Sequence, residues 1–290
     1  MLKPTYGLRS IFGTTRGARL FAINTMAAFG LVSAAVQFGG QLLPAAMPSS
    51  TTVVSTSIFL CLGWGLLRAY PRSRIEHELR NPAMTVTVRV GDLFEEDSDL
   101  VVGFSDTFDT STNNNTVISK SSLQGQLLHR LYADDAVRLD REINTALART
   151  APLARESRTG KRKGKLLRYP LGTVAVLNRP GRKIFAVAYS RMGNDYVARS
   201  SVEDLWLSLD RLWDAVYSHG QRGRLAIPLM GAGLARVDAL DRESLLKMTL
   251  LSFVARSRQG LFCRELRMVI SPPDVEKINL LEVAAFLRTL

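Results

Sequence analysis

The sequence lacks charged side chains over a long amino-terminal stretch. Between Arg19 and Arg68 it contains no Asp, Glu, Lys, Arg or His. The surface of a soluble domain is rich in charged residues, so this composition excludes an ordinary soluble fold for that stretch. Residues 1–70 therefore form a segment that is distinct from the rest of the chain.

Cysteine and histidine are also scarce. The two cysteines, Cys61 and Cys263, are too few for a disulfide framework or a cysteine-based metal site. This usage is consistent with a reducing cytoplasm. None of the three histidines (His77, His129 and His219) stands beside a Ser or Cys in an activating sequence context. The sequence therefore predicts no catalytic residue and no metal.

The basic charge of the chain does not by itself indicate nucleic acid. Residues 1–80 hold eight Lys/Arg and two Glu, giving +6, and the other thirty basic and twenty-four acidic residues complete the net +12. The segment Arg155–Arg168 holds seven Lys/Arg and one Glu. It contains no aromatic residue, which disfavours single-strand binding. We expect a solvated loop, with contact to anionic lipid headgroups as the next alternative and nucleic-acid binding as a third.

Two apolar segments in the uncharged stretch predict a transmembrane helical hairpin. We place the spans at about residues 20–43 and 51–69, and the first has the ~20 residues that a membrane span needs. Basic residues flank the pair and none lies in the connecting loop, so both termini are expected in the cytoplasm. A cleaved signal peptide is the alternative. It is disfavoured because the apolar segment exceeds the usual core of about 7–15 residues and a second one follows.

The remainder of the chain has the pattern of an α/β domain. Residues 71–84 are polar and predict a linker, and the domain is expected over residues 85–290. Strands are expected at 85–90, 100–104, 173–177, 183–189, 225–230 and 266–270, and helices at 122–149, 201–219, 241–253 and 274–290. Their alternation in the second half predicts a mixed sheet with helices on both faces.

Short polar residues follow the first two of these strands. Gly91 and Asp92 end one strand, and the sequence SDTFDT follows the other. A carboxylate and a hydroxyl-rich loop at one sheet edge can bind a sugar or a base. Asp106 and Asp109 are either ribose ligands or surface acids, and the Asn113–Asn115 run is expected in a solvated loop.

Two further segments can present backbone N–H groups to a phosphate. The strand at 225–230 leads into Gly231-Ala-Gly233, where no side chain obstructs the backbone. The alternative is a flexible turn between strand and helix. Ser121–Gly125 leads into a helix and either offers donors to a phosphate or only caps that helix. The Tyr189-Ser190-Arg191 segment follows a strand and can reach the same edge.

The order of these motifs resembles that of the macro domain, the ADP-ribose-binding module, over roughly residues 85–290. VRVGDLF, VVGFSDTFDT and SSLQGQLL carry the resemblance. The apolar hairpin makes the chain most similar to the membrane-anchored macro-domain effectors of type II Thoeris anti-phage defence. The resemblance implies a mixed-sheet, macro-like three-layer α/β/α domain preceded by a two-helix transmembrane hairpin.

The resemblance also implies the ligand-binding residues. Asp92 would accept from the adenine amino group with the Leu93 backbone alongside, the Ser105–Asp109 loop would face the ribose, and two glycine-bearing loops would hold the diphosphate and distal ribose. The expected set is Asp92, Leu93, Ser105, Asp106, Thr107, Phe108, Asp109, Ser122, Leu123, Gln124, Gly125, Met230, Gly231, Ala232, Gly233, Leu234 and Ala235.

The resemblance favours a sensor over an enzyme. Hydrolytic macro domains generally carry an Asn-Ala-Ala-Asn-type segment and a triple-glycine loop, where this chain has FSDT and SSLQG. The implied protein is a bacterial inner-membrane effector without a cofactor. It would bind ADP-ribose or a conjugate such as histidine-ADP-ribose made by a TIR-domain partner enzyme, then oligomerise with its own copies and disrupt membrane lipid in abortive infection. The alternative is a membrane-tethered ADP-ribosyl hydrolase or another nucleotide-processing enzyme, and no nucleic-acid partner is expected.

Overall fold

The structure is a computed structural model that describes residues 4–42, 49–80, 82–233, 235 and 237–290. The chain divides into two compact units. The hairpin unit comprises residues 1–73 and 279–285, and the sheet unit comprises residues 74–278 and 286–290. Each unit is described by itself.

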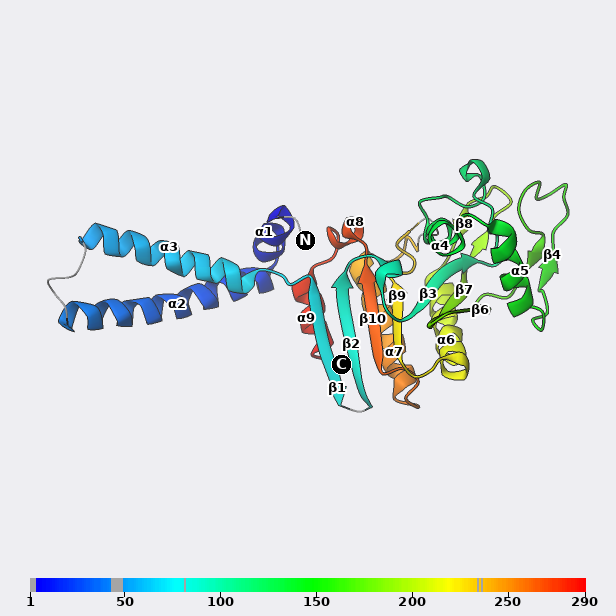
Figure 1. Cartoon of the computed structure of the whole chain (residues 1–290). Coiled ribbons are helices and arrows are strands. Elements are labelled where there is room, and N and C mark those ends of the chain that lie inside the picture. Colours follow the sequence, from blue (N-terminus) through cyan, green and yellow to red (C-terminus); the bar gives the residue numbers. More distant parts are fainter. Residues whose placement is uncertain (1–3, 43–48, 81, 234, 236) are drawn as a thin grey trace. The chain divides into compact units, whose positions relative to one another are not determined.

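Two long apolar helices make up most of the hairpin unit. Its helices are α1 (Pro4–Phe12), α2 (Thr15–Leu42) and α3 (Ser50–Ala69). Helices α2 and α3 lie side by side (Figure 1), and Gly65 permits a close approach because a Cβ there would lie 2.0 Å from Thr25 Oγ1. Both helices are long and apolar enough to cross a membrane, and little of either is buried. The expected spans fall on these helices, except that residue 43 lies outside the described residues.

Residues from the far end of the sequence also belong to the hairpin unit. Helix α9 (Leu280–Leu287) begins in the hairpin unit and ends in the sheet unit. The Leu280 amide donates to the Tyr6 hydroxyl over 3.2 Å, and Arg16 pairs with Glu282 at 3.3 Å. The hairpin unit is therefore not a contiguous piece of the chain.

The sheet unit is built on a mixed sheet whose central strands are parallel. In sheet order its strands are β1 (Arg74–Arg80), β2 (Ala83–Val90), β10 (Glu265–Ile270), β9 (Arg224–Pro228), β3 (Asp99–Ser105), β7 (Arg182–Met192) and β6 (Val174–Arg179). The pairs from β2 to β7 are parallel, whereas β1 and β6 pair antiparallel at the edges. The short β8 (Ala198–Arg199) pairs with β7, and β4 (Ala154–Arg155) pairs with β5 (Leu167–Arg168).

Helices cover both faces of this sheet, as expected. They are α4 (Leu123–Tyr132), α5 (Ala136–Ala146), α6 (Val202–His219), α7 (Arg242–Ser257) and the short α8 (Pro272–Val275). Alternate residues of β3, such as Leu100 and Val102, pack with α4 and α5 in one core cluster. On α6 and α7, Trp213 packs against Phe253 with ring centroids 5.4 Å apart. Period-2 alternation along the strands thus sends side chains into two cores.

The structure corrects three of the expected boundaries. The predicted linker contains a strand, because β1 pairs with β2 over its whole length, with His77 opposite Val86. The helix expected at 122–149 is divided into α4 and α5 by Ala133 and Asp134, both at positive φ. The helix expected at 274–290 is divided into α8 and α9. The helix starts at Ser201 and Asp241 are confirmed, because each side chain accepts from the amide three residues later.

The basic segment Arg155–Arg168 is only partly solvated. Lys161 is fully buried, and its ammonium donates to Asp109 over 2.8 Å and to the Lys165 carbonyl over 2.7 Å. Arg168 donates to Asp106 over 2.7 Å. The expectation of a solvated loop is wrong for Lys161 and Arg168, because two carboxylates in the SDTFDT sequence hold them against the sheet unit.

Candidate functional site

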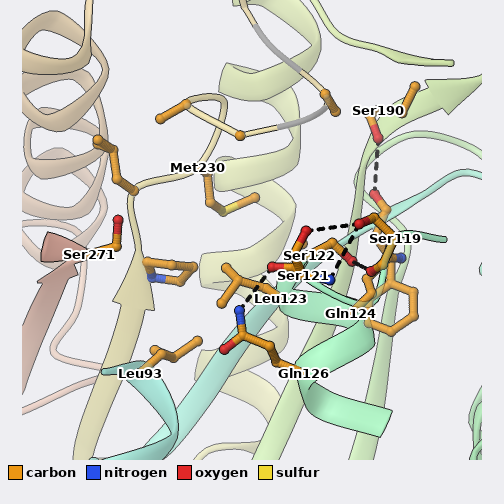
Figure 2. Close-up of a pocket in the computed structure, with 18 of the residues that line it drawn as sticks. Leu93, Ser119, Ser121, Ser122, Leu123, Gln124, Gln126, Ser190, Met230 and Ser271 are labelled. Atoms are coloured by element: carbon orange, nitrogen blue, oxygen red, sulfur yellow. Dashed lines mark hydrogen bonds between the residues drawn. The ribbon is translucent and has the colours of Figure 1, made fainter. Parts of the chain in front are cut away.

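A cavity of about 830 Å³ lies where the parallel strands end. Segments that follow β2, β3, β7, β9 and β10 all contribute to its lining, together with the start of α4. Open α/β sheets bind ligands outside the carboxyl ends of parallel strands, because loops from several strands converge there. Figure 2 shows this convergence, with Leu93, Met230 and Ser271 on one side and the serines before α4 on the other.

Asp92 lies at one end of the cavity. Its side chain caps the 3₁₀ turn at Leu93–Glu95, where Oδ1 accepts from the Phe94 amide over 2.9 Å. Its Oδ2 accepts from Arg130 of α4. Burial works to raise the pKa of the Asp92 carboxyl, but the bonds from Arg130 and Phe94 outweigh burial and hold that pKa below its usual value. The cavity therefore has an ionised acceptor at this end at neutral pH.

A network of hydroxyls shapes the cavity beside the start of α4 (Figure 2). Ser122 Oγ accepts from the Gly125 amide over 3.1 Å and donates to the Ser119 carbonyl over 2.6 Å. Gln126 donates to the Ser121 carbonyl over 3.0 Å. The amide nitrogen of Gln124 is buried and finds no hydrogen-bond partner within the described part of the chain. The cavity is therefore lined here by the amino terminus of a helix, which favours anions.

Tyr189 supports the glycine-bearing loop that follows β9. Gly231 has φ +79°, a conformation that favours glycine. The Tyr189 hydroxyl is hydrogen-bonded to the Gly231 backbone, and burial raises the pKa of Tyr189 to about 12. The Tyr189 ring lies over Gly103, where a Cβ would come within 2.4 Å of it. Arg242 supports the same loop by donating to the Ala232 carbonyl over 3.3 Å.

Most of the expected ligand-binding residues come together around the cavity. Those that line it are Asp92, Leu93, Ser105, Ser122, Leu123, Gln124, Met230, Ala232, Gly233 and Ala235. Gly125 and Gly231 are buried behind the lining and shape the loops that form it. Leu234 lies outside the described residues.

Four expected residues do not reach the cavity. Asp106, Thr107, Phe108 and Asp109 are buried and absent from its lining. Asp106 accepts from the Met192 amide over 2.8 Å as well as from Arg168, and Thr107 donates to Asp109 over 2.6 Å. Asp106 and Asp109 are therefore not surface acids, because both are buried. The contact of this loop with a ribose stays a prediction.

Comparison with known proteins places the chain in a family. The sequence model described as "Thoeris protein ThsA, Macro domain" matches residues 86–271. The chain belongs to this family. The resemblance carried by VRVGDLF, VVGFSDTFDT and SSLQGQLL is thereby confirmed, together with the mixed α/β macro fold.

Solved structures show a more distant likeness to this ThsA-type macro domain. An Oceanobacillus iheyensis macrodomain with ADP is 12% identical over 75% of this chain and 98% of its own, with a TM-score of 0.49. A mutant of that macrodomain with ADPR is 12% identical over 75% and 100%, with a TM-score of 0.48. A tomato leucine aminopeptidase mutant is 16% identical over 73% and 38%, with a TM-score of 0.38. No curated protein matches the chain.

Sequence reasoning missed part of the lining of this macro domain. The segment after β10 contributes Ser271 and Asp274, and the segment after β7 contributes Met192 and Tyr196. Strand β10 was expected, so the rule that parallel strand ends share an edge was enough to find Ser271. Tyr196 carries no such signal, because its place depends on a left-handed turn with φ 63°.

The described lining contains polar side chains but carries little charge. Among the described lining residues, Asp92 and Asp274 are the only charged side chains, and histidine and cysteine are absent. The described residues contain no group of three or more His, Cys, Asp or Glu that could hold a metal ion. An anionic ligand here would be held by backbone amides and hydroxyls, because the described lining contains no cation.

Proposed function

We propose that this macro domain is the sensor of a membrane-anchored defence effector that binds ADP-ribose or a conjugate of it. The observation that carries the proposal is the combination of groups in one cavity. Its described lining includes the ionised acceptor Asp92, the serines at the amino terminus of α4, and Ala232 and Gly233 of the glycine-bearing loop. A base with an amino group and a diphosphate are the ligand parts that these groups recognise.

The rest of the proposal concerns what binding does. The signal is an ADP-ribose conjugate such as histidine-ADP-ribose, produced by a TIR-domain partner enzyme. Binding orders the loops around the cavity, favours assembly of several copies, and brings the α2–α3 hairpins together so that they disrupt the bacterial inner membrane. The ligand drives this change only to the extent that it binds the assembled state more tightly. Both termini lie on the cytoplasmic side, where the signal is made.

Titration of the full chain in detergent with ADP-ribose tests the proposal. We expect saturable binding by calorimetry, recovery of unchanged ligand by mass spectrometry, and a larger assembly by mass photometry when a histidine conjugate is added. Release of ADP-ribose from a modified protein would instead support the hydrolase. Absence of binding to any ADP-ribose derivative would reject both functions.

Asp92→Ala should lower the affinity for ADP-ribose by about 10–150-fold, the range for a hydrogen bond to a charged group. The matched control is Asp97→Ala, because the Asp97 side chain is 90% exposed, pairs only with Arg224 among the described residues, and lies outside the cavity lining. The two variants should melt at similar temperatures. If Asp92→Ala bound ADP-ribose as tightly as the unmodified chain does, Asp92 would not be a ligand-binding residue.

The membrane role is tested at the middle of α3. Phe59 is 77% exposed in the hairpin unit, so Phe59→Arg places a charge on an outward face of the helix. A charge at the centre of a span costs about 2.5–3.5 kcal/mol on insertion scales. We expect the variant to leave the membrane fraction, and cells that also make the TIR-domain enzyme should survive. Phe59→Leu should behave as the unmodified chain does. Continued killing by a soluble Phe59→Arg variant would contradict membrane disruption.

A further inference from the structure

Arg130 links two parts of the cavity lining. It lies near the carboxyl end of α4, whose amino terminus lines the cavity, and its guanidinium bonds to Asp92, which also lines it. Eight residues separate Ser122 from Arg130, which is about 12 Å of helix. One rigid helix therefore spans from one half of the site to the other.

The guanidinium is itself held in place. Arg130 Cζ lies 5.5 Å from the centroid of the Phe94 ring, which is buried. Phe94 also supplies the amide that binds the other oxygen of Asp92. The carboxylate thus has one oxygen fixed by the 3₁₀ turn and one by Arg130, and both partners meet at Phe94. A guanidinium stacked on a ring keeps its planar donors in one orientation.

Other charged groups around Asp92 are engaged elsewhere. On β2, Arg89 pairs with Glu96 at 3.0 Å. On α8, Asp274 pairs with Arg242 at 2.7 Å. On α4, His129 contacts Asp134 at 2.9 Å. Within the described residues, Arg130 is the one ion-pair partner of Asp92.

We propose that Arg130 is a positioning residue that holds Asp92 as a fixed, ionised acceptor, and that it thereby sets the base specificity of the cavity. A carboxylate that cannot rotate or take up a proton accepts from an exocyclic amino group and repels a carbonyl oxygen. The cavity consequently selects an aminopurine over its oxo counterpart. This inference rests on the proposed function, because it assigns the Asp92 end to a base.

Arg130→Ala in the full chain tests the inference with a pair of ligands, ADP-ribose and its hypoxanthine analogue. The unmodified chain should prefer ADP-ribose by about tenfold or more. Arg130→Ala should lower the affinity for ADP-ribose about tenfold and leave that for the analogue within about twofold, so the preference disappears. Arg130→Lys keeps the charge without the planar fork and should retain part of the preference.

The pH dependence of the affinity for ADP-ribose provides a second test. If Arg130 had a purely structural role, its removal would not change this dependence. A carboxyl whose pKa is lowered accepts above that pKa and loses this role as pH falls through it. With Arg130 present, affinity should stay level between about pH 7.5 and pH 5. Without Arg130, burial still raises the pKa of Asp92 and only the Phe94 amide bond opposes it, so that pKa should rise and affinity should fall toward pH 5.

The control is Arg138→Ala on α5, where Arg138 pairs with Glu142 at 3.2 Å and lies 5.9 Å from the Tyr132 ring, outside the lining. It should change neither preference nor pH profile. Equal losses for both ligands, or an unchanged preference in Arg130→Ala, would overturn the inference. Failure of the unmodified chain to bind either ligand would instead reject the proposed function.

Discussion

Replacing Lys161 with alanine is expected to lower the free energy of unfolding of the sheet unit by about 3–5 kcal/mol, the cost of breaking a buried ion pair from one side. The side chains of Lys161 and Asp109 are 0% and 1% exposed. Without the ammonium, the Asp109 carboxylate keeps only the Thr107 hydroxyl and the Lys165 amide as described partners. An ionised group in that position has lost its counter-charge and cannot regain water.

Thermal unfolding of the full chain in detergent measures this effect. The midpoint should fall by roughly 6–20 °C, since about 2–4 °C corresponds to each kcal/mol in a unit of this size. Arg162→Ala is the matched control, because Arg162 is the next residue of the same basic segment and is exposed. Its midpoint should stay within about 2 °C of that of the unmodified chain. Similar melting of the two variants would show that the Lys161–Asp109 pair does not stabilise the fold.

Gly125→Ala should reduce the affinity for ADP-ribose by about 10–100-fold, equivalent to an overpacking cost of about 1.4–2.7 kcal/mol. A Cβ at Gly125 would lie 2.4 Å from the Ser119 carbonyl oxygen and 2.7 Å from Lys120 Cα. Both atoms belong to the backbone, so a side-chain rotation cannot relieve the overlap. The segment that carries Ser119 and Ser121 into the cavity must move instead.

Calorimetric titration of the full chain with ADP-ribose gives this affinity directly. The control is Gly260→Ala, because nothing lies within 4 Å of a Cβ at Gly260 and the residue is outside the lining. Both variants should retain the circular dichroism spectrum of the unmodified chain. If Gly125→Ala binds ADP-ribose as tightly as Gly260→Ala does, the segment before α4 does not contact the ligand.

Most of the fold followed from periodicity. The alternation of apolar residues predicted β2. The capping side chains of Ser201 and Asp241 predicted the starts of α6 and α7. Strand β1 was not predicted, because an edge strand with the sequence RIEHELR buries only Leu79 and its charged residues resemble those of a linker. The strand became visible only through its pairing with β2.

The candidate site was predictable at the level of segments but not of individual carboxylates. Asp92 and Asp109 look alike in sequence, since each is an aspartate in the segment that follows a strand. Their surroundings differ because Lys161 folds back onto Asp109 from 52 residues away, whereas Asp92 stays at the cavity. Such distant pairing leaves no local pattern. The roles of the lining residues toward a ligand stay predictions.

The inclusion of residues 279–285 in the hairpin unit has a consequence for the order of synthesis. A ribosome makes α1, α2 and α3 before every strand of the sheet and residues 279–285 after every strand. Until then the Tyr6 hydroxyl has no Leu280 amide to accept from and Arg16 has no Glu282. A nascent or prematurely terminated chain therefore carries a hairpin without its finished packing. The hairpin unit, which we propose disrupts the membrane, therefore cannot be completed until the strands of the sheet unit, which we propose controls it, have been synthesised.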